Sequence, residues 1–477
     1  MIGPRGREIA RRGRDKAGAM RPFRFVLALA VALAAAAPAT AALQRRALLG
    51  VAMAPDRQTG NGATVTGIVP GGTAEALGLR VGDLVVRAGQ GAIARPADLV
   101  AYTATLHGGS PVALTVRRGA RQLVLRAPAV ARPLESYAGA HVDYGAVEFG
   151  GGQLRDILVT PDGVAAPPIV YLIQGFACAT MEIPLYHRLG EELVRRGIGF
   201  YRVEKPGMGD SAGGAPCATI DYATELDAFR TAYRHLMTAR GVDADRVFML
   251  GHSLGGLEVP MLAAERPPRG VAAYGTVLRN WADYYRDLIQ FQPYLFEGTD
   301  LAAQSARAEQ MRELLRRFFF LREEPAAIAA ADPTYAAGLR EFFGWDGGQL
   351  MFGRSFKFMQ DLARQPVVAA WRDARTNVLA LYGESDMVAL FDTDHKLVAD
   401  LANFLRPGTG RYVEIPRTGH GMDLIGNRQE VRARTRAEGN VPQGEFNPAV
   451  ADALAAWIRD SMASPPVRER FPAPAAG

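Results

Sequence analysis

Cysteine, lysine and histidine are all scarce in this chain of 477 residues, which contains two, four and seven of them. Two cysteines cannot form the framework of a disulfide-rich mini-protein. Neither the cysteines nor the histidines occur at the short spacings of metal ligands, so no metal and no organic cofactor is expected. Hydrophobic residues at 48% and charged residues at 22% are ordinary globular values, which excludes a disordered or collagen-like chain.

Long hydrophobic runs are missing as well. The most apolar stretch, which begins at Phe25, has thirteen residues, whereas a membrane-spanning helix needs about 20. Arg21 and Arg24 lie before this stretch and Ala39-Thr40-Ala41 lies after it, which is the layout of a cleavable signal peptide. We therefore expect residues 1–41 to be an export leader of a bacterial protein that is periplasmic or secreted. Contact with a membrane is expected only if the leader stays uncleaved.

The net charge of the chain is positive, at a formal +6, which by itself favours a nucleic-acid or anionic-membrane partner. Residues 1–41 contain eight basic and two acidic side chains, so they account for the whole excess. Met20, which opens the signal-peptide pattern, is an alternative start. Once the leader is removed, the formal charge of the remaining chain is zero, and no nucleic-acid partner is expected.

Export makes a disulfide between the two cysteines possible, because an oxidising compartment permits such a bond. Cys178 and Cys217 both flank loops at the ends of expected strands. We therefore predict that they form a disulfide, and two unrelated buried thiols are the alternative.

Residues 44–130 contain short alternating stretches separated by glycine-rich turns. Residues 65–69 alternate and end at Pro70-Gly71-Gly72, and residues 111–117 alternate again beyond a helical stretch at 97–106. The run PGGTAEALGLRVGD and the Leu-Gly-Val loop before it resemble a bacterial PDZ domain.

The PDZ resemblance implies a peptide-binding groove. In that family, backbone N–H groups of a loop before a strand bind the C-terminal carboxylate of a peptide, which then adds to the sheet as a strand. The implied binding residues are Leu49, Gly50 and Val51 of the loop, with Leu99 and Tyr102 on the groove helix. The alternative is a PDZ domain that packs on its neighbour and binds no free peptide.

Strands and helices alternate over residues 140–465. Apolar runs predict strands at 169–173, 199–203, 246–250, 271–274, 377–382 and 412–415, and longer amphipathic stretches predict helices at 184–196, 222–240 and 449–462. This alternation is typical of an α/β domain with a mostly parallel sheet and helices on both faces.

The strongest motif is GHSLGG at residues 251–256, which lies between an apolar strand and a helix. G-x-S-x-G in this context is a nucleophile elbow, a turn so tight that Gly251 and Gly255 must lack side chains. The motif predicts Ser253 as a nucleophile and the backbone N–H of Leu254 as a donor to an oxyanion.

A nucleophilic serine needs a histidine base and an acid that orients the base. His420 lies in RTGHGMD directly after a strand and is the predicted base, whereas His395 falls within a helix and is expected at the surface. Asp386, in a loop after the strand at 377–382, is the predicted acid. The other carboxylates of this part of the chain are Glu384, Asp392 and Asp394, which are alternative acids, and Asp423, which is expected to be a turn residue.

Residues 140–465 resemble the α/β-hydrolase superfamily, in particular exported serine hydrolases of the serine-aminopeptidase and esterase-like group. The resemblance implies that the Phe176 N–H is the second oxyanion donor. The loop VEKPGMGDSAG at 203–213 resembles that group's turn after the fourth strand and is given no chemical role. Residues 277–372 hold 17 of the 40 aromatic residues. We expect them to form a helical cap over Ser253 that selects apolar or aromatic groups.

The sequence thus predicts an α/β-hydrolase fold with a helical cap, preceded by a small PDZ-type β+α domain and followed by a C-terminal tail at 466–477. The predicted activity is hydrolysis of a small ester or a peptide through an acyl-enzyme, with a possible C-terminal peptide ligand at the PDZ groove. The rival hypothesis is a non-catalytic binding platform recruited through the PDZ domain. Whether the substrate is an ester or a peptide stays open at this point.

Overall fold

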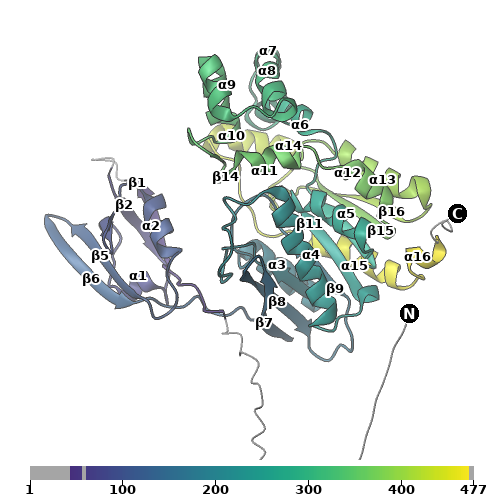
Figure 1. Cartoon of the computed structure of the whole chain (residues 1–477), viewed down its shortest axis with the longest axis horizontal. Coiled ribbons are helices and arrows are strands. Elements are labelled where there is room, and N and C mark those ends of the chain that lie inside the picture. Colours follow the sequence, from purple (N-terminus) through teal and green to yellow (C-terminus); the bar gives the residue numbers. More distant parts are fainter. Residues whose placement is uncertain (1–42, 56–60, 472–477) are drawn as a thin grey trace, which may run out of the picture. The chain divides into compact units, whose positions relative to one another are not determined.

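The computed structural model describes residues 43–55 and 61–471 (Figure 1). The expected leader at 1–41 lies outside the described residues, as do residues 472–477 of the C-terminal tail. Within the described part of the chain, no helix is both long and apolar enough to cross a membrane.

The N-terminal domain is built around a six-stranded antiparallel sheet of order β1-β2-β3-β5-β6, with β4 paired to β3. Its elements are β1 (Val51–Pro55), β2 (Ala63–Ile68), α1 (Thr73–Ala76), β3 (Leu84–Ala88), β4 (Gly91–Ala92), α2 (Pro96–Thr103), β5 (Pro111–Arg118) and β6 (Arg121–Pro128). Strand β1 lies at an edge of the sheet, so one side of its backbone has no strand partner among the described residues. Alternate side chains of the strands, among them Val85 and Leu114, pack into one core.

The second domain contains an eight-stranded sheet of order β16-β15-β12-β11-β9-β10-β8-β7. Its strands are β7 (Ala140–Phe149), β8 (Gly152–Pro161), β9 (Ile169–Ile173), β10 (Gly199–Val203), β11 (Val247–His252), β12 (Gly270–Tyr274), β15 (Asn377–Gly383) and β16 (Gly410–Ile415). The parallel strands of this sheet are β9, β10, β11, β12, β15 and β16. Strand β8 is antiparallel to both β10 and β7. A mostly parallel sheet is therefore present, as the alternating pattern predicted. The hairpin β7–β8 was not among the predicted strands.

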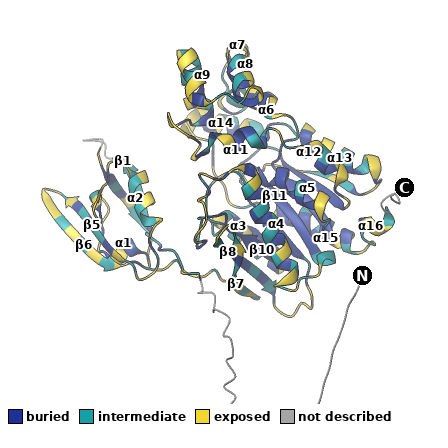
Figure 2. Ribbon diagram, in the orientation of Figure 1, coloured by how far each residue is buried: buried dark blue, intermediate teal, exposed yellow. Residues whose placement is uncertain are grey.

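Helices cover both faces of this sheet. Every residue of β9 is buried, and its side chains alternate between two cores: Tyr171 and Ile173 join one, Val170 and Leu172 the other. The first core is shared with α4 (Tyr222–Thr238), α5 (Gly255–Glu265) and α13 (Thr393–Leu405), and the second with α3 (Pro184–Arg195) and α15 (Pro448–Met462). Figure 2 shows the buried strands between these helix layers. Strands buried on both faces explain why the sequence reads as continuous apolar runs.

The cap inserted between β12 and β15 is mainly helical. It comprises α6 (Trp281–Gln292), the π-helical turns η2 (Pro293–Glu297) and η3 (Arg316–Phe320), α7 (Leu301–Gln310), α8 (Arg312–Leu315), α9 (Pro325–Ala331), α10 (Pro333–Phe343), β13 (Leu350–Met351), β14 (Arg354–Ser355), α11 (Phe356–Leu362) and α12 (Val367–Asp373). Many of its aromatic rings form the cap's own core, as in the stacked pair Tyr285 and Phe343, whose ring centres lie 4.4 Å apart. The small hairpin β13–β14 is an addition to the helical cap that the sequence predicted.

The remaining elements are the 3-10 turn η1 (Ala244–Arg246), α14 (Arg428–Glu438) and α16 (Val467–Arg470). Helix α16 falls within the expected C-terminal tail, and Val467 is buried there.

Candidate active site

The GHSLGG motif forms a sharp turn between β11 and α5. Ser253 has a φ of 56°, in the left-handed region that a residue with a Cβ adopts only under constraint. A Cβ on Gly251 would lie 2.3 Å from the Gly255 carbonyl oxygen, and one on Gly255 would lie 2.1 Å from the Ile173 carbonyl oxygen. The two glycines are therefore required by close backbone packing, and they leave Ser253 at the end of the central strand.

Asp386 and His420 meet at the same edge of the sheet, beyond β15 and β16. His420 Nδ1 lies 2.8 Å from Asp386 Oδ2, and the backbone N–H groups of Val388 and Ala389 donate to Asp386 Oδ1 at 2.7 and 2.8 Å. Asp386 is completely buried. Burial alone would raise the pKa of Asp386, but His420 and the two N–H donors outweigh it and lower this pKa. Asp386 is therefore an ionised partner that orients the imidazole.

His252 ties the loop of His420 to the elbow. Its Nε2 lies 2.9 Å from the His420 carbonyl oxygen, so Nε2 must donate, and its Nδ1 accepts from the hydroxyl of Tyr186 at 3.0 Å. Burial, helped by the nearby His420, lowers the pKa of His252 to about 4. Among the hydrogen bonds of the described residues, none joins Ser253 Oγ directly to the His420 ring, a contact that often tightens only when substrate binds.

The three alternative acids are engaged elsewhere. Glu384 accepts a backbone N–H at 2.7 Å, and Asp392 forms an ion pair with Lys396. Asp394 binds the guanidinium of Arg279 with both carboxylate oxygens. Of the carboxylates named from the sequence, Asp386 is the one bonded to the His420 ring.

The expected position of His395 was wrong. It lies in α13, as predicted, but it is completely buried, and its Nε2 accepts the backbone N–H of Thr276 at 3.1 Å. Burial lowers the pKa of His395 to about 4, so its ring is neutral. Asp423, which was expected to be a turn residue, instead forms an isolated β-bridge with Phe446, and its carboxylate accepts the backbone N–H of Gly444 at 3.1 Å.

Two backbone N–H groups belong to residues that line the same cavity as Ser253. Leu254 precedes the first turn of α5, and Phe176 follows β9 in the loop where Gly175 comes close to the serine. A Cβ on Gly175 would lie 3.1 Å from Ser253 Cβ and 3.5 Å from its Oγ. Neither the Phe176 N–H nor the Leu254 N–H has an acceptor among the described residues. The arrangement can therefore offer two unpaired donors to an oxyanion beside the nucleophile.

A cavity of about 120 Å³ adjoins Ser253. Its wall is apolar and aromatic, formed by the core residues Phe176, Leu254, Leu257 and Val388 and by the cap residues Trp281, Tyr284, Tyr285 and Phe352, with Gly275, Thr276 and Val277 between them. No side chain in this lining carries a charge. The cap therefore contributes an apolar wall to the cavity, besides packing its own core.

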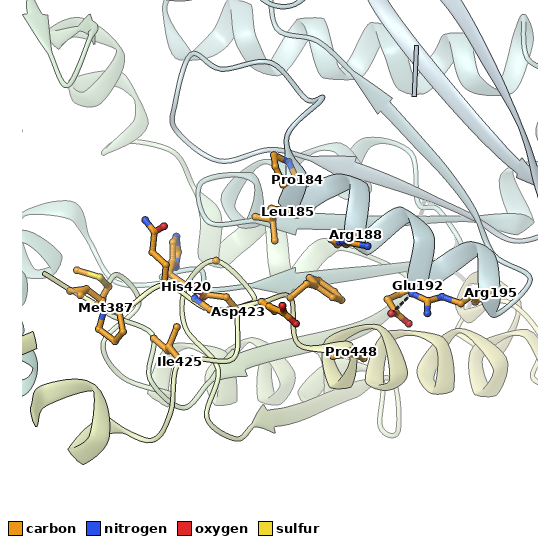
Figure 3. A pocket seen from close by; sticks show the side chains of 17 residues that line it. Pro184, Leu185, Arg188, Glu192, Arg195, Met387, His420, Asp423, Ile425 and Pro448 are labelled. Carbon is orange, nitrogen blue, oxygen red and sulfur yellow. Dashed lines mark hydrogen bonds and ion pairs between the residues drawn. The ribbon is translucent and has the colours of Figure 1, made fainter. Parts of the chain in front are cut away.

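A larger groove of about 750 Å³ reaches His420 (Figure 3). Met387 and His420 lie toward one end of the groove, and Glu192 and Arg195 toward the other. Further lining residues include Leu185, Arg188, Asp423, Val441, Gln443 and Glu445. In contrast to the cavity at Ser253, this groove has charged side chains of both signs.

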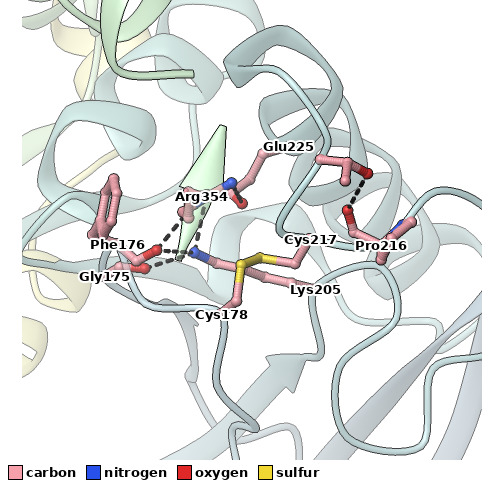
Figure 4. Close-up of a disulfide and its surroundings, with 9 residues drawn as sticks. Gly175, Phe176, Cys178, Lys205, Pro216, Cys217, Glu225 and Arg354 are labelled. Carbon is pink, nitrogen blue, oxygen red and sulfur yellow. Dashed lines mark hydrogen bonds and ion pairs between the residues drawn. A yellow bond between two sulfur atoms is a disulfide. The ribbon is translucent and has the colours of Figure 1, made fainter. Parts of the chain in front are cut away.

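The disulfide predicted from the sequence is present. Cys178 and Cys217 are bonded, with their Cα atoms 5.8 Å apart, and join the loop after β9 to the loop after β10. Figure 4 shows the bond beside Gly175, Phe176 and Lys205. Lys205 belongs to the segment 203–213, to which the sequence interpretation gave no chemical role, and its ammonium contacts the carbonyl of Gly175 at 2.7 Å.

In the N-terminal domain, the loop before β1 turns its carbonyl groups inward. The carbonyls of Leu49 and Gly50 accept the N–H groups of Ala74 and Val69 at 2.8 and 2.9 Å. The N–H groups of Leu49 and Gly50 have no acceptor in the described part of the chain, and Gly50 has a φ of 69°. A loop of this geometry can bind an anion such as a carboxylate.

The other implied groove residues are placed differently. Val51 begins the edge strand β1, and Tyr102 of α2 is partly buried and packs against the domain core. Leu99 is completely buried in that core, so it cannot line an open groove as the resemblance implied. Its neighbour Val100 is 57% exposed.

Among the described residues, no group of three or more histidine, cysteine, aspartate or glutamate side chains is arranged to hold a metal ion.

Comparisons with known proteins identify both domains. Residues 168–403 match the family described as serine aminopeptidase, S33, and residues 47–127 match the family described as PDZ domain. No curated protein matches the chain.

Several solved structures resemble this chain at low identity. Est1E from Butyrivibrio proteoclasticus is 15% identical, with 67% of this chain and 99% of that chain covered and a TM-score of 0.41. A proline iminopeptidase from Mycobacterium smegmatis is 16% identical over 67% and 99% of the two chains, with a TM-score of 0.40. The esterase domain of a Rhodothermus marinus protein is 16% identical over 69% and 99%, with a TM-score of 0.38. The chain therefore combines a PDZ domain at residues 47–127 with an α/β-hydrolase domain whose residues 168–403 match the serine aminopeptidase S33 family.

Proposed function

We propose that this protein is an exported serine esterase for esters of compact apolar or aromatic acids. The observation that carries the proposal is the uncharged aromatic cavity of about 120 Å³ beside Ser253. Transfer of an apolar acyl group from water into such a cavity is favourable, and the small volume limits the size of that group.

The proposed chemistry follows from the geometry around Ser253. Ser253 Oγ attacks the acyl carbonyl while His420 Nε2 takes its proton, and Asp386 holds Nδ1–H and stabilises the imidazolium. The Phe176 and Leu254 N–H groups donate to the oxyanion. His420 then protonates the leaving alcohol, and water activated by the same histidine releases the acid from Ser253.

The groove that reaches His420 suits the leaving group. The departing oxygen must take its proton from His420, so the alcohol leaves on the side where this ring is accessible. That side has a volume of about 750 Å³ and charged walls, whereas the acyl side is small and apolar. The proposed substrates therefore combine a compact acyl group with a larger, polar alcohol.

A peptidase is the second candidate, favoured by the family description and by a PDZ domain that could capture a peptide. An aminopeptidase must bind the α-ammonium of its substrate, for which carboxylates are the usual partners. None of the residues that line the cavity at Ser253 is acidic. This observation favours the esterase over the aminopeptidase.

The deciding experiment is a paired screen of p-nitrophenyl esters of short aliphatic and aromatic acids against aminoacyl p-nitroanilides. We expect turnover of the esters, abolished in Ser253→Ala, and little turnover of the nitroanilides. Faster cleavage of the nitroanilides would reverse the assignment. A non-catalytic platform would leave both substrate sets intact and would not react with a fluorophosphonate probe.

We also propose that the PDZ domain binds a free C-terminal carboxylate at Leu49 and Gly50, with the peptide paired to the edge of β1. The test is fluorescence polarisation with a library of labelled peptides, each compared with its C-terminal amide. Binding that survives amidation would contradict the proposed carboxylate site.

Export through residues 1–41 is likewise a proposal, tested by N-terminal sequencing of the protein from a bacterial periplasm or culture medium.

A further inference from the structure

A buried group of charged side chains lies beneath the loop that carries the Phe176 N–H. Lys205 from the loop after β10, Glu225 from α4 and Arg354 from β14 are all completely buried. Lys205 Nζ lies 3.0 Å from Glu225 Oε1, and the Arg354 guanidinium binds both Glu225 oxygens, at 2.6 and 3.1 Å. Figure 4 shows Lys205 and Arg354 reaching Gly175 and Phe176, with Glu225 beside the two cations.

Both cations of this group donate to backbone carbonyls of the loop. Lys205 Nζ is 2.7 Å from the Gly175 oxygen, and Arg354 Nη1 is 3.0 Å from the Phe176 oxygen. The Gly175 oxygen and the Phe176 N–H belong to the same peptide unit, which is planar. In a trans peptide these two groups point in opposite directions. A cation that fixes the oxygen on one side therefore fixes the direction of the N–H on the other.

We propose that Lys205 is a positioning residue for the oxyanion hole: its ammonium holds the Gly175–Phe176 peptide so that the Phe176 N–H faces the oxygen that becomes negative at Ser253. The inference rests on the proposed function, since an oxyanion hole matters only if Ser253 is acylated. An ammonium on the carbonyl also polarises the peptide, which makes its N–H a stronger donor. A preorganised donor of this kind acts mainly in the transition state.

The charge balance supports a role beyond packing. Glu258 of α5 is a fourth buried member, and burial, reinforced by repulsion from Glu225, raises its pKa well above the usual range. A neutral Glu258 leaves Lys205 and Arg354 against the single negative charge of Glu225. Burying an ion pair is costly and is weak evidence for stability, so an apolar group would serve packing equally well.

Lys205→Met tests the inference, with Lys357→Met as the matched control because Lys357 is an exposed lysine on α11. The variant keeps the balanced pair of Glu225 and Arg354, so we expect it to fold. The expected result is a fall in kcat of about 10²-fold on a p-nitrophenyl ester with KM changed less than threefold. Affinity for an aryl boronic acid, which forms a tetrahedral adduct with the serine, should fall in parallel. The control should keep the wild-type values.

A folded Lys205→Met with kcat within threefold of wild type would overturn the positioning role. So would a fall in kcat without weaker boronate binding. A structural defect that leaves the oxyanion hole intact can lower kcat and leave the affinity for the tetrahedral adduct unchanged. If Lys205→Met does not fold, the shorter Lys205→Gln is measured in the same way and judged by the same two outcomes. Ser253→Ala is assayed beside them: if it is as active as wild type, or if wild type hydrolyses nothing, the proposed function itself fails, and the role of Lys205 with it.

Discussion

The Asp386 carboxylate lies 2.8 Å from His420 Nδ1 through one oxygen and accepts two backbone N–H groups through the other. The carboxylate is thus held at both ends and is closed to water. It can serve only one ring tautomer of His420, the one that carries its proton on Nδ1 and leaves Nε2 free as a base.

Replacing Asp386 tests this relationship. Asp386→Asn is nearly isosteric but can favour the wrong tautomer, so we expect kcat for ester hydrolysis to fall about 10³- to 10⁴-fold with a small change in KM. Asp392→Asn is the matched control, because Asp392 pairs with Lys396 away from His420, and it should keep kcat within threefold. A large loss in the control together with an active Asp386→Asn would reassign the acid.

The backbone of Ser253 predicts a stability difference between two inactive variants. Ser253→Ala keeps a Cβ at a φ of 56°, whereas Ser253→Gly relieves this strain. We expect Ser253→Gly to be more stable than Ser253→Ala by about 1 kcal/mol, since the strain at such a residue costs about 1–3 kcal/mol. Urea unfolding of both variants measures the difference. Equal midpoints would show that the elbow stores no strain at this residue.

The disulfide predicts sensitivity to reductant. Cys178 and Cys217 are 39 residues apart, and closing a loop of this size stabilises the folded chain by about 3–4 kcal/mol in the chain-entropy model. Reduction should therefore lower the Tm of the wild type and also its esterase activity, because the bond borders the loop of Phe176. The double variant Cys178→Ser/Cys217→Ser should match the reduced wild type and show no response to reductant. A response in the double variant would trace the effect to something other than this bond.

Glu204 predicts a stability that depends on pH. It is completely buried and accepts from Thr180 Oγ1 and Met181 N, and burial raises its pKa from 4.5 to about 7. The unfolded chain thus releases this proton at lower pH than the folded one, so the folded state loses stability as pH rises from about 4.5 to about 7. Above that window the folded protein carries the full cost of the buried charge.

Glu204→Gln removes the charge and keeps one acceptor. The Tm of Glu204→Gln minus the Tm of wild type should be larger at pH 8 than at pH 5. Scanning fluorimetry of both proteins at the two pH values measures this difference. The same Tm difference at both pH values would contradict the raised pKa. Glu384→Gln, at a partly exposed carboxylate, controls for the general effect of losing one negative charge.

The elbow and the parallel sheet were predictable because each rests on local rules. The sequence around Ser253 combines a buried strand, two glycines that sterics demand and a helix start, all within ten or so residues. Strand β7 was missed because it alternates only weakly: its pattern includes Asp143, Gly145 and Glu148, and it lies at the edge of the sheet. Edge strands lack the continuous apolar run that marks strands buried on both faces.

His395 shows a signal that was present and not used. Val398, Ala399 and Ala402 follow it at intervals of three, four and seven residues, and all four are buried. This spacing puts His395 on the inward face of α13. A histidine in an apparent surface helix should therefore be judged by its place on the helical wheel.

The group around Lys205 could not have been predicted by any local rule. Its members come from a loop (Lys205), a core helix (Glu225) and a cap hairpin (Arg354). Arg354 follows Lys205 by 149 positions in the sequence. Single-sequence patterns do not report such contacts, because each residue alone reads as an ordinary surface charge.

The ion pair between Arg354 and Glu225 also bears on how substrates enter. Arg354 belongs to the cap and Glu225 to the core helix α4, and neither side chain is exposed to solvent. If the cap swung away as a rigid lid, it would separate two desolvated charges, which costs about 3–5 kcal/mol when one partner is lost. We therefore expect the cap to stay docked on α4 during turnover. Ligands should then enter and leave along the groove that reaches His420, without any movement of the cap.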